Sequence, residues 1–174
     1  MRPECPGAYE EPETEARLNY WGYAPGHLLA PKASYCAGAV KEPVREFKQL
    51  VKDLHRAGLE LVIELYFTGK EYPGLVLEAA RFWAREYHVD GIHLVGNVPA
   101  ALVGADPYLS RIKLLANGWD PGEGRSARHL AECNDGFMLD MRRFLKGDEG
   151  MLDKVCFRSR RNPAGFGVIN YMAD

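Results

Sequence analysis

Two hydrophobic periodicities alternate along most of the chain. In residues 42–58, apolar side chains recur at intervals of three and four, which places them on one face of a helix. Pro43 suits the first turn of that helix and Gly58 suits its end. Residues 59–67 (LELVIELYF) follow at once and are apolar on both faces, as a buried parallel strand should be. This segment of the chain therefore predicts a helix followed by a buried strand.

The same order recurs further along the chain. Helices are predicted over residues 75–88, 136–148 and 151–161, and strands over residues 89–96, 112–119, 129–134 and 167–173. Residues 1–17 are rich in Pro and Glu and are expected to form an extended lead, and residues 18–40 to form a long irregular loop. Alternating helices and apolar strands predict an α/β protein with a parallel sheet, either doubly wound or a β/α barrel.

Composition narrows the functional classes. The chain has 174 residues, enough for one sizeable domain, and a net charge of -2. Such a balance favours neither nucleic acid nor an acidic membrane surface as a partner. The apolar runs are far shorter than the roughly 18 residues that span a bilayer, and the N-terminus lacks the apolar core of a signal peptide. Four scattered cysteines without a C-x-x-C pair fit free thiols in a reducing cytoplasm.

Cofactor motifs are missing from the sequence. No Gly-x-Gly-x-x-Gly or Walker loop follows a predicted strand, and the glycines of residues 120–126 (DPGEGRS) lack the Gly-Lys-Ser/Thr ending of a phosphate loop. The cysteines are too widely separated for a zinc site, and His88 and His93 form only a weak candidate metal pair. We expect no cofactor and no metal.

Six segments in order carry a family resemblance. They are NYWGYAPGHLLAP (19–31), VREFKQLVKDLHRAGLELVIEL (44–65), FWAREYHVDGIHL (82–94), KLLANGWDPG (113–122), NDGFMLDMRRFLKGDEGML (134–152) and INYMAD (169–174). Together they resemble the α-amylase superfamily, glycoside hydrolase family 13, in its glycogen-debranching, isoamylase and pullulanase branch. The resemblance runs from about residue 18 to the C-terminus.

The resemblance implies a β/α barrel, and only part of one. A whole barrel has eight strands and about 250 residues. Aligned to the family, residues 18–174 form a partial barrel domain with about five of the eight parallel strands. Unpaired sheet edges are a liability. The remaining barrel strands or a partner subunit are therefore expected to cover the two edges.

The resemblance also locates the positions of the family's catalytic groups. Retaining glycosidases need two carboxyl groups about 5 to 5.5 Å apart, one as nucleophile and one as general acid. The nucleophile position falls on Val95, in the sequence GIHLV, and the general-acid position falls on Asn117, in the sequence ANGWD. Neither side chain can do the work of an acid. The first motif keeps one acidic residue, Glu64, and the third catalytic position lies beyond Asp174. The sequence predicts no catalytic residue and hence a pseudoenzyme.

A protein that has lost its catalytic residues can still bind sugar. The residue that matches Tyr23 stacks on a glucose ring in the family, and aromatic faces suit sugars. Trp119, Asp120, His93 and Glu64 complete the candidate substrate-binding set, although the two aromatic residues could serve packing alone. We predict a non-hydrolytic α-glucan-binding or regulatory protein. The alternatives are an α-1,6-glucan hydrolase whose acids have moved, to Glu64, Asp106 or Asp120, and a fragment with no function of its own.

Overall fold

A single sheet of five parallel strands organises the protein. The computed structural model describes residues 28–37, 41–119, 127–161 and 165–172. The strands are β1 (Val62–Phe67), β2 (Gly91–Gly96), β3 (Lys113–Ala116), β4 (Leu130–Cys133) and β5 (Gly167–Ile169). Their order in the sheet is their order in the chain, and every neighbouring pair is parallel. The predicted α/β class with five parallel strands is confirmed.

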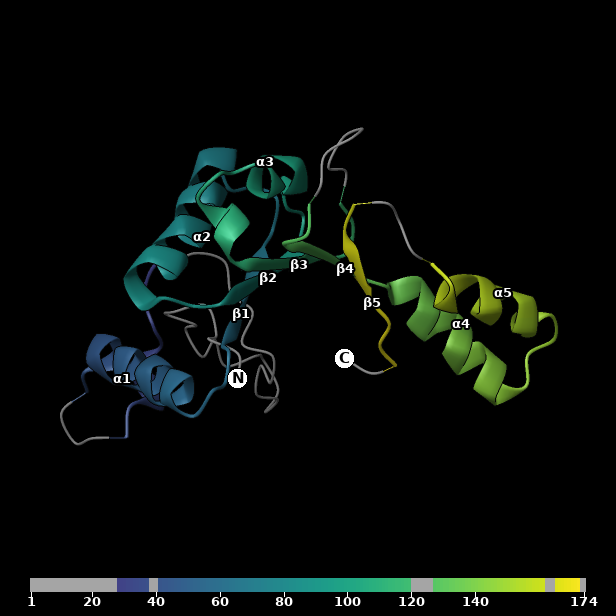
Figure 1. Ribbon diagram of the computed structural model, residues 1–174, viewed down its shortest axis with the longest axis horizontal. Coiled ribbons are helices and arrows are strands. Elements are labelled where there is room, and N and C mark those ends of the chain that lie inside the picture. The colour runs from purple at the N-terminus through teal and green to yellow at the C-terminus, as the bar shows by residue number, and fades with distance from the viewer. Residues whose placement is uncertain (1–27, 38–40, 120–126, 162–164, 173–174) are drawn as a thin grey trace, which may run out of the picture.

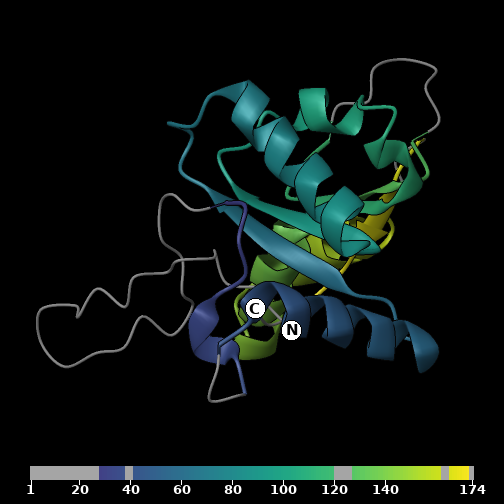
Figure 2. The same cartoon turned by 90° about the vertical axis from the view of Figure 1, so that its left-hand side faces the viewer.

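Helices connect the strands. They are α1 (Pro43–Arg56), α2 (Pro73–Tyr87), α3 (Ala100–Gly104), α4 (Asp135–Lys146) and α5 (Met151–Ser159), with 3-10 turns η1 (Ala33–Tyr35) and η2 (Leu109–Arg111). Figure 1 shows α2 and α3 on one face of the sheet, and α4 and α5 as a pair beyond β5. Figure 2, seen from the side of β1, shows α1 running below that strand. The predicted helices are confirmed, and α3 is an element that the hydrophobic pattern did not predict.

Local chemistry sets the ends of several helices. Pro43 opens α1 and Pro73 opens α2, where a missing N–H costs no hydrogen bond. The chain leaves α1 through Gly58, whose φ is +74°, a conformation that glycine adopts without strain. Asn134 caps α4, because its side-chain oxygen accepts a hydrogen bond from the N–H of Phe137 at 3.1 Å.

The two faces of the sheet have different surroundings. Along β1, Ile63, Leu65 and Phe67 are fully buried and alternate with half-buried residues. The buried set packs on α2, whose Trp83 is also fully buried and stacks on Tyr87 with ring centroids 4.6 Å apart. The indole N–H of Trp83 donates to the carbonyl of Leu28 at 2.8 Å. The hydrophobic core therefore lies between the sheet and its helices.

The second face of the sheet carries mostly half-buried side chains. Its residues alternate with the core residues, and most are half-buried; they include Glu64, Tyr66, His93, Val95, Leu115 and Ala131. In a closed barrel this face would be the packed interior. Within the described residues, β1 and β5 each pair on one side only. The arrangement is that of part of a barrel wall.

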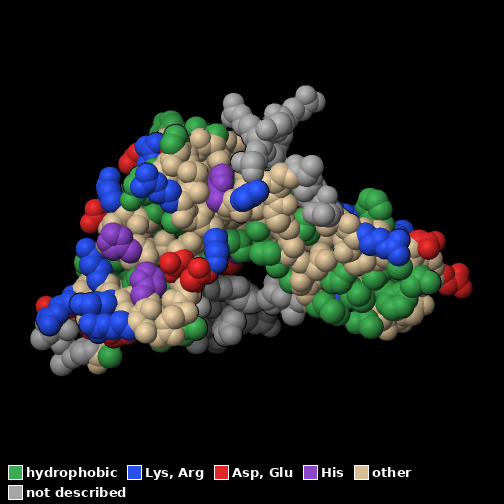
Figure 3. Space-filling model, viewed as in Figure 1, with side chains coloured by type: hydrophobic (Ala, Val, Ile, Leu, Met, Phe, Trp, Pro, Cys, Tyr) green, Lys and Arg blue, Asp and Glu red, His purple; other side chains and the backbone are tan. Residues whose placement is uncertain are grey.

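An apolar surface covers the α4–α5 pair. Figure 3 shows hydrophobic side chains gathered over these two helices. Leu139, Leu145, Leu152 and Phe157 are each more than half exposed. A surface of this kind commonly marks a contact with further protein.

Candidate functional site

The carboxyl ends of the strands bring three polar side chains together. Asn117 follows β3, and its amide Nδ2 donates to Asp135 Oδ2 at 2.8 Å. The hydroxyl of Tyr171, after β5, donates to the other oxygen of Asp135. Val95, the fifth residue of β2, lies in register with Tyr66 of β1. The strand ends thus present an amide and a valine at the two positions where the family resemblance expects acids.

Glu64 and His93 form a pair across the sheet. They are direct register partners on β1 and β2, and His93 Nδ1 lies 2.9 Å from Glu64 Oε2. Glu64 is the third of six residues in β1, so it lies in mid-strand and not near the tip as we expected from the sequence. Both side chains are mostly buried, with 14% of Glu64 and 25% of His93 exposed. The pair is a largely buried ion pair on the second face of the sheet.

Cys133 extends this pair into a row of three. Its Sγ lies 3.6 Å from His93 Nε2, the ring nitrogen that Glu64 does not contact. Burial disfavours a charged imidazole, but the hydrogen bonds and charges of Cys133 and Glu64 outweigh it and raise the pKa of His93 to about 9. Sequence reasoning treated Cys133 as one of four scattered thiols. Only the fold, which reaches from β2 across β3 to β4, brings it to His93.

Two buried carboxylates serve the helix side of the sheet. Asp106 Oδ2 lies 2.5 Å from Arg81 Nη2, and Asp106 Oδ1 accepts the N–H of Leu109 at 3.0 Å. Burial opposes ionisation of Asp106, yet the hydrogen bonds from Arg81 and the backbone lower its pKa. Glu132 of β4 is held by Arg161, with 2.5 Å between Oε1 and Nη1. Asp106, a candidate substitute acid in the sequence, is therefore engaged in a structural ion pair.

The loop after β1 carries an exposed aromatic side chain. Glu71 folds this loop by accepting hydrogen bonds from the N–H and hydroxyl of Thr68 and the N–H of Gly69. Tyr72 follows it and is 84% exposed. In a parallel sheet this strand-to-helix loop shares an edge with Asn117 and Asp135. Sequence reasoning overlooked Tyr72.

Trp119 makes packing contacts. Its indole N–H donates to the carbonyl of Ala131 at 2.8 Å. Its ring also lies against Gly104, since a Cβ added there would meet it at 3.0 Å. Two of the predicted binding residues, Tyr23 and Asp120, lie outside the described residues, as does the predicted lead 1–17.

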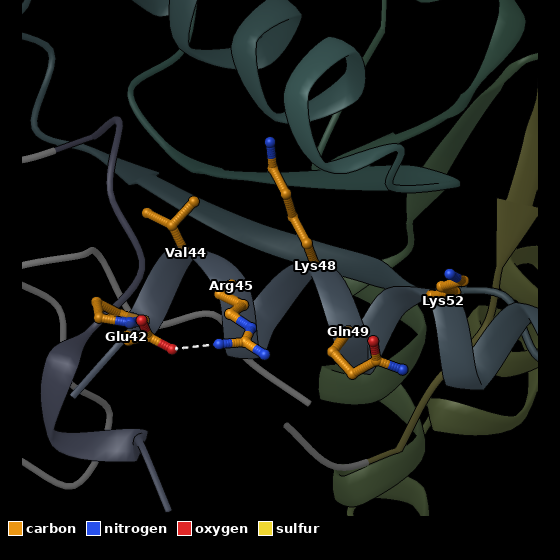
Figure 4. A pocket seen from close by; sticks show the side chains of 7 residues that line it. Glu42, Val44, Arg45, Lys48, Gln49 and Lys52 are labelled. Carbon is orange, nitrogen blue, oxygen red and sulfur yellow. Dashed lines mark hydrogen bonds and ion pairs between the residues drawn. The ribbon is translucent and has the colours of Figure 1, made fainter. Parts of the chain in front are cut away.

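Other features of the described residues add nothing to this site. No group of three or more His, Cys, Asp and Glu side chains in this part of the chain could hold a metal ion. A depression of about 660 Å³ follows α1 and is lined by Glu42, Pro43, Val44, Arg45, Lys48, Gln49 and Lys52. Figure 4 shows that these side chains come from one helix and its start. The depression is open to solvent and shares no lining residue with the candidate site at the strand ends.

Sequence comparison relates the chain to debranching enzymes. It is 31% identical to a glycogen debranching enzyme of Serratia proteamaculans, over 75% of this chain and 30% of that protein. It is 28% identical to the chloroplastic isoamylase 3 of Oryza sativa subsp. japonica, over 77% of this chain and 26% of that protein. No family model matches. The chain spans about a third or less of the length of these curated relatives.

Fold comparison finds the same group. A pullulanase from Paenibacillus barengoltzii, solved with maltohexaose and α-cyclodextrin, matches with a TM-score of 0.61 and 18% identity, over 86% of this chain and 34% of that one. A glycogen-degrading pneumococcal virulence factor, SpuA, matches with a TM-score of 0.64 and 16% identity, over 88% of this chain and 23% of that one. The resemblance to the debranching branch is confirmed.

No helix among the described residues has the length and apolar character needed to cross a membrane.

Proposed function

This chain is a relative of the glycogen-debranching, isoamylase and pullulanase branch of the α-amylase superfamily, and we propose that it binds α-glucan without hydrolysing it. The observation that carries the proposal is the state of the strand ends. Val95 and Asn117 occupy the expected acid positions, and Asn117 donates its amide to Asp135. An amide and an aliphatic group cannot supply the nucleophile and general acid that a retaining mechanism requires.

Among the described residues, three carboxylates that could replace them are engaged elsewhere. Glu64 pairs with His93, Asp135 accepts hydrogen bonds from Asn117 and Tyr171, and Asp106 is held by Arg81. A substitute general acid has to be protonated near neutral pH, but the hydrogen bonds from Arg81 and the backbone lower the pKa of Asp106. This supports a loss of hydrolysis and not a relocation of the acids.

Glucan binding rests on the relatives and on aromatic side chains. Relatives with solved structures include a pullulanase that was solved with maltohexaose. The family resemblance implies that the residue matching Tyr23 stacks on a glucose ring. We propose that Tyr23 and Tyr72 offer stacking faces for glucose rings, and that Glu64, His93, Trp119 and Asp120 belong to the same substrate-binding set. Stacking of this kind needs exposed ring area, which Tyr72 has.

Hydrolysis is tested on the full chain with pullulan and glycogen. We expect release of reducing ends no faster than in a protein-free blank, because the loss of a nucleophile alone typically costs on the order of 10⁴ to 10⁶ in rate. Release that disappears in Glu64→Gln or Asp135→Asn, and persists in the surface variant Glu78→Gln, would establish a hydrolase with relocated acids instead.

Binding is tested by affinity gel electrophoresis in glycogen. The wild type should be retarded, and Tyr23→Ala and Tyr72→Ala should each weaken retardation several-fold. Tyr108→Ala is the matched control, because Tyr108 is also exposed but lies before β3, at the opposite edge of the sheet. Equal migration with and without glycogen, in a chain that is folded by circular dichroism, would refute glucan binding.

Further protein is proposed to complete the sheet. Within the described residues, the one-sided pairing of β1 and β5 and the exposed apolar α4–α5 surface support the remaining barrel strands or a partner subunit as cover. Light scattering on the purified chain should therefore report self-association, which a Leu145→Glu and Phe157→Glu double variant should reduce. A fully monomeric wild type would contradict the need for cover.

We also propose a cytoplasmic location, because the three described cysteines are free thiols.

A further inference from the structure

A hollow of about 630 Å³ lies between α1 and the end of α2. It adjoins the depression along α1, with which it shares Lys48 and Lys52, and it has no residue in common with the candidate site at the strand ends. Figure 3 shows Lys, Arg and His side chains gathered on the side of the molecule where these two helices lie. The described residues that line the hollow are Lys48, Val51, Lys52, His55, Arg56, Glu86, Tyr87 and His88.

Three cations of α1 line this hollow in a row. Lys48, Lys52 and Arg56 follow each other at intervals of four residues, which places them on one side of the helix about 6 Å apart along its axis. Like charges at this spacing repel each other and weaken a helix. The negative end of the helix dipole accounts for a cation in the last turn, such as Arg56, but not for Lys48 and Lys52 before it. The stability of α1 therefore does not explain the row.

The two lysines keep most of their charge for a ligand. Lys52 is exposed and forms no ion pair with the described residues. The Nζ of Lys48 lies 5.5 Å from the centre of the Tyr87 ring and 3.9 Å from a carboxylate oxygen of Glu86, which is a long distance for an ion pair. Figure 4 shows the Lys48 side chain extending away from α1. The aromatic ring thus holds this lysine over the hollow without neutralising it.

The third cation has donors to spare. One guanidinium nitrogen of Arg56 contacts Asp53 at 3.1 Å, and the two side chains are 65% and 55% exposed. A guanidinium has five N–H donors, and an exposed ion pair of this kind is weak. His55 lies 2.8 Å from Asp90, and neither Asp53 nor Asp90 lines the hollow. Arg56 can therefore turn further donors to a bound anion.

The charges that oppose an anion here are smaller. Glu86 is the acid among the described lining residues, and Arg85 contacts it at 3.3 Å. Three cations against this one acid leave the lining with a net charge of +2, counting the histidines as neutral. The carbonyl ends of α1 and α2 add partial charges of about −0.5 each. The hollow therefore keeps a positive charge.

We propose that this hollow binds the phosphate group of a small molecule, either inorganic phosphate or a sugar phosphate. A phosphate group carries a charge of about −1.5 to −2 at neutral pH and three acceptor oxygens. Lysine binds phosphate as a point charge and arginine as a fork of donors, and the row supplies both. A hollow of about 630 Å³ is also large enough for a small organic ligand, whose hydroxyl groups could bond with the rings of His55 and His88.

Binding is tested with the full chain by phosphorus NMR, in which a phosphate probe broadens when it binds protein. Inorganic phosphate and glucose 6-phosphate are titrated separately at neutral pH and low salt. We expect broadening with a dissociation constant of about 1 mM for at least one probe. Raising the salt to about 0.2 M should weaken binding several-fold, because salt screens exposed charges.

Substitutions locate the site. Lys48→Gln and Lys52→Gln should each weaken binding by about 2- to 5-fold, the size of effect expected of an exposed charge contact, and together by about tenfold. Glu86→Gln should tighten binding by about 2-fold, because it removes the acid of the hollow and releases Lys48. A gain of this kind cannot come from damage to the fold.

Matched controls separate this site from a general effect of charge. The double variant Lys146→Gln and Lys154→Gln removes two charges from exposed positions on α4 and α5, and it should bind the probe like the wild type. Glu78→Gln plays the same part for Glu86→Gln, since Glu78 is exposed and does not line the hollow. Retardation in glycogen should be the same in Lys48→Gln as in the wild type, so the glucan proposal and this one can fail separately.

The outcomes divide as follows between the two sources of phosphate. Tighter binding of glucose 6-phosphate than of inorganic phosphate supports the site with an ester as its ligand, and equal binding supports it with the free ion. Probe lines that stay sharp with the folded wild type overturn the proposal. So does a loss of binding that is as large in the α4 and α5 double variant as in the double variant of Lys48 and Lys52.

Discussion

Replacing Asp106 by Asn should destabilise the fold severely, because this carboxylate is a buried anchor and not a surface acid. Asp106 is 5% exposed and contacts Arg81 through Nη2 at 2.5 Å and Nε at 3.2 Å. Its other oxygen accepts the N–H groups of Tyr108 and Leu109, at 3.1 and 3.0 Å. One side chain thus joins α2 to the turn η2 that leads into β3.

The expected cost follows from these contacts. In the Asn variant the side-chain oxygen can still accept the two backbone N–H groups, but the amide cannot pair with the guanidinium. Hydrogen bonds to charged groups contribute roughly 1.5 to 3 kcal/mol each. Arg81 is 36% exposed and regains some solvation, so we expect a loss of about 3 kcal/mol in the free energy of unfolding. Asp106→Ala also removes the backbone acceptor and should cost about 4 to 5 kcal/mol.

Urea unfolding followed by circular dichroism at pH 7 measures this loss. Glu78→Gln is the matched control, because Glu78 binds the same arginine at 3.0 Å but is 59% exposed, and it should cost less than about 0.5 kcal/mol. The lowered pKa of Asp106 means that its contribution is present above about pH 4 and is lost as the pH falls through its folded pKa. The reasoning fails if Asp106→Asn and Glu78→Gln are equally stable, or if their difference persists undiminished in acid.

Three further substitutions test the packing and the turns. Trp83→Ala should lower the free energy of urea unfolding by about 3 to 5 kcal/mol, because Trp83 is fully buried. Leu145 is exposed, so Leu145→Ala should change it by less than about 0.5 kcal/mol. Similar values for the two variants would contradict the assignment of the core. Gly96→Ala should cost more than about 2 kcal/mol, because its Cβ would lie 2.1 Å from the carbonyl oxygen of Phe67 and its φ is +89°. The Cβ of Gly58→Ala would meet no atom within 4 Å, so this variant should cost only about 1 to 2 kcal/mol. A thermal melt that ranks these two the other way round would be inconsistent with the geometry. Asn134→Ala should cost about 2 kcal/mol in the free energy of unfolding, because it removes the cap of α4. An unchanged urea midpoint, followed by the helical circular dichroism signal, would count against that role.

The sequence predicted the elements well where a periodic pattern was long. The helix at 42–58 and the strand at 59–67 appear as α1 and β1, because amphipathic spacing and an apolar run are imposed by burial itself. The five-residue α3 (Ala100–Gly104) is too short to show a period, and it was missed. The segment 129–134 was expected to be a short strand and forms β4.

The site was less accessible to sequence reasoning. His93 lies in mid-strand on β2, where its Nδ1 is 2.9 Å from Glu64 Oε2. Its second contact, to Cys133 forty residues later, depends on the register of three strands and on the curvature of the sheet. Local patterns carry no information about either. Tertiary pairing of this kind becomes visible only when the strands are assembled.

The order of the strands has a consequence for how the sheet assembles. Each described strand pairs, within the described residues, only with the strands next to it in the chain, so a nascent polypeptide can add these strands one at a time, each onto a strand already formed. No strand has to be threaded between two others, and the loops to be closed stay short. Removing β5 would leave the pairing among β1 to β4 unchanged. Strands can therefore be added to or lost from the edges of this sheet without any change in the pairing of its central strands.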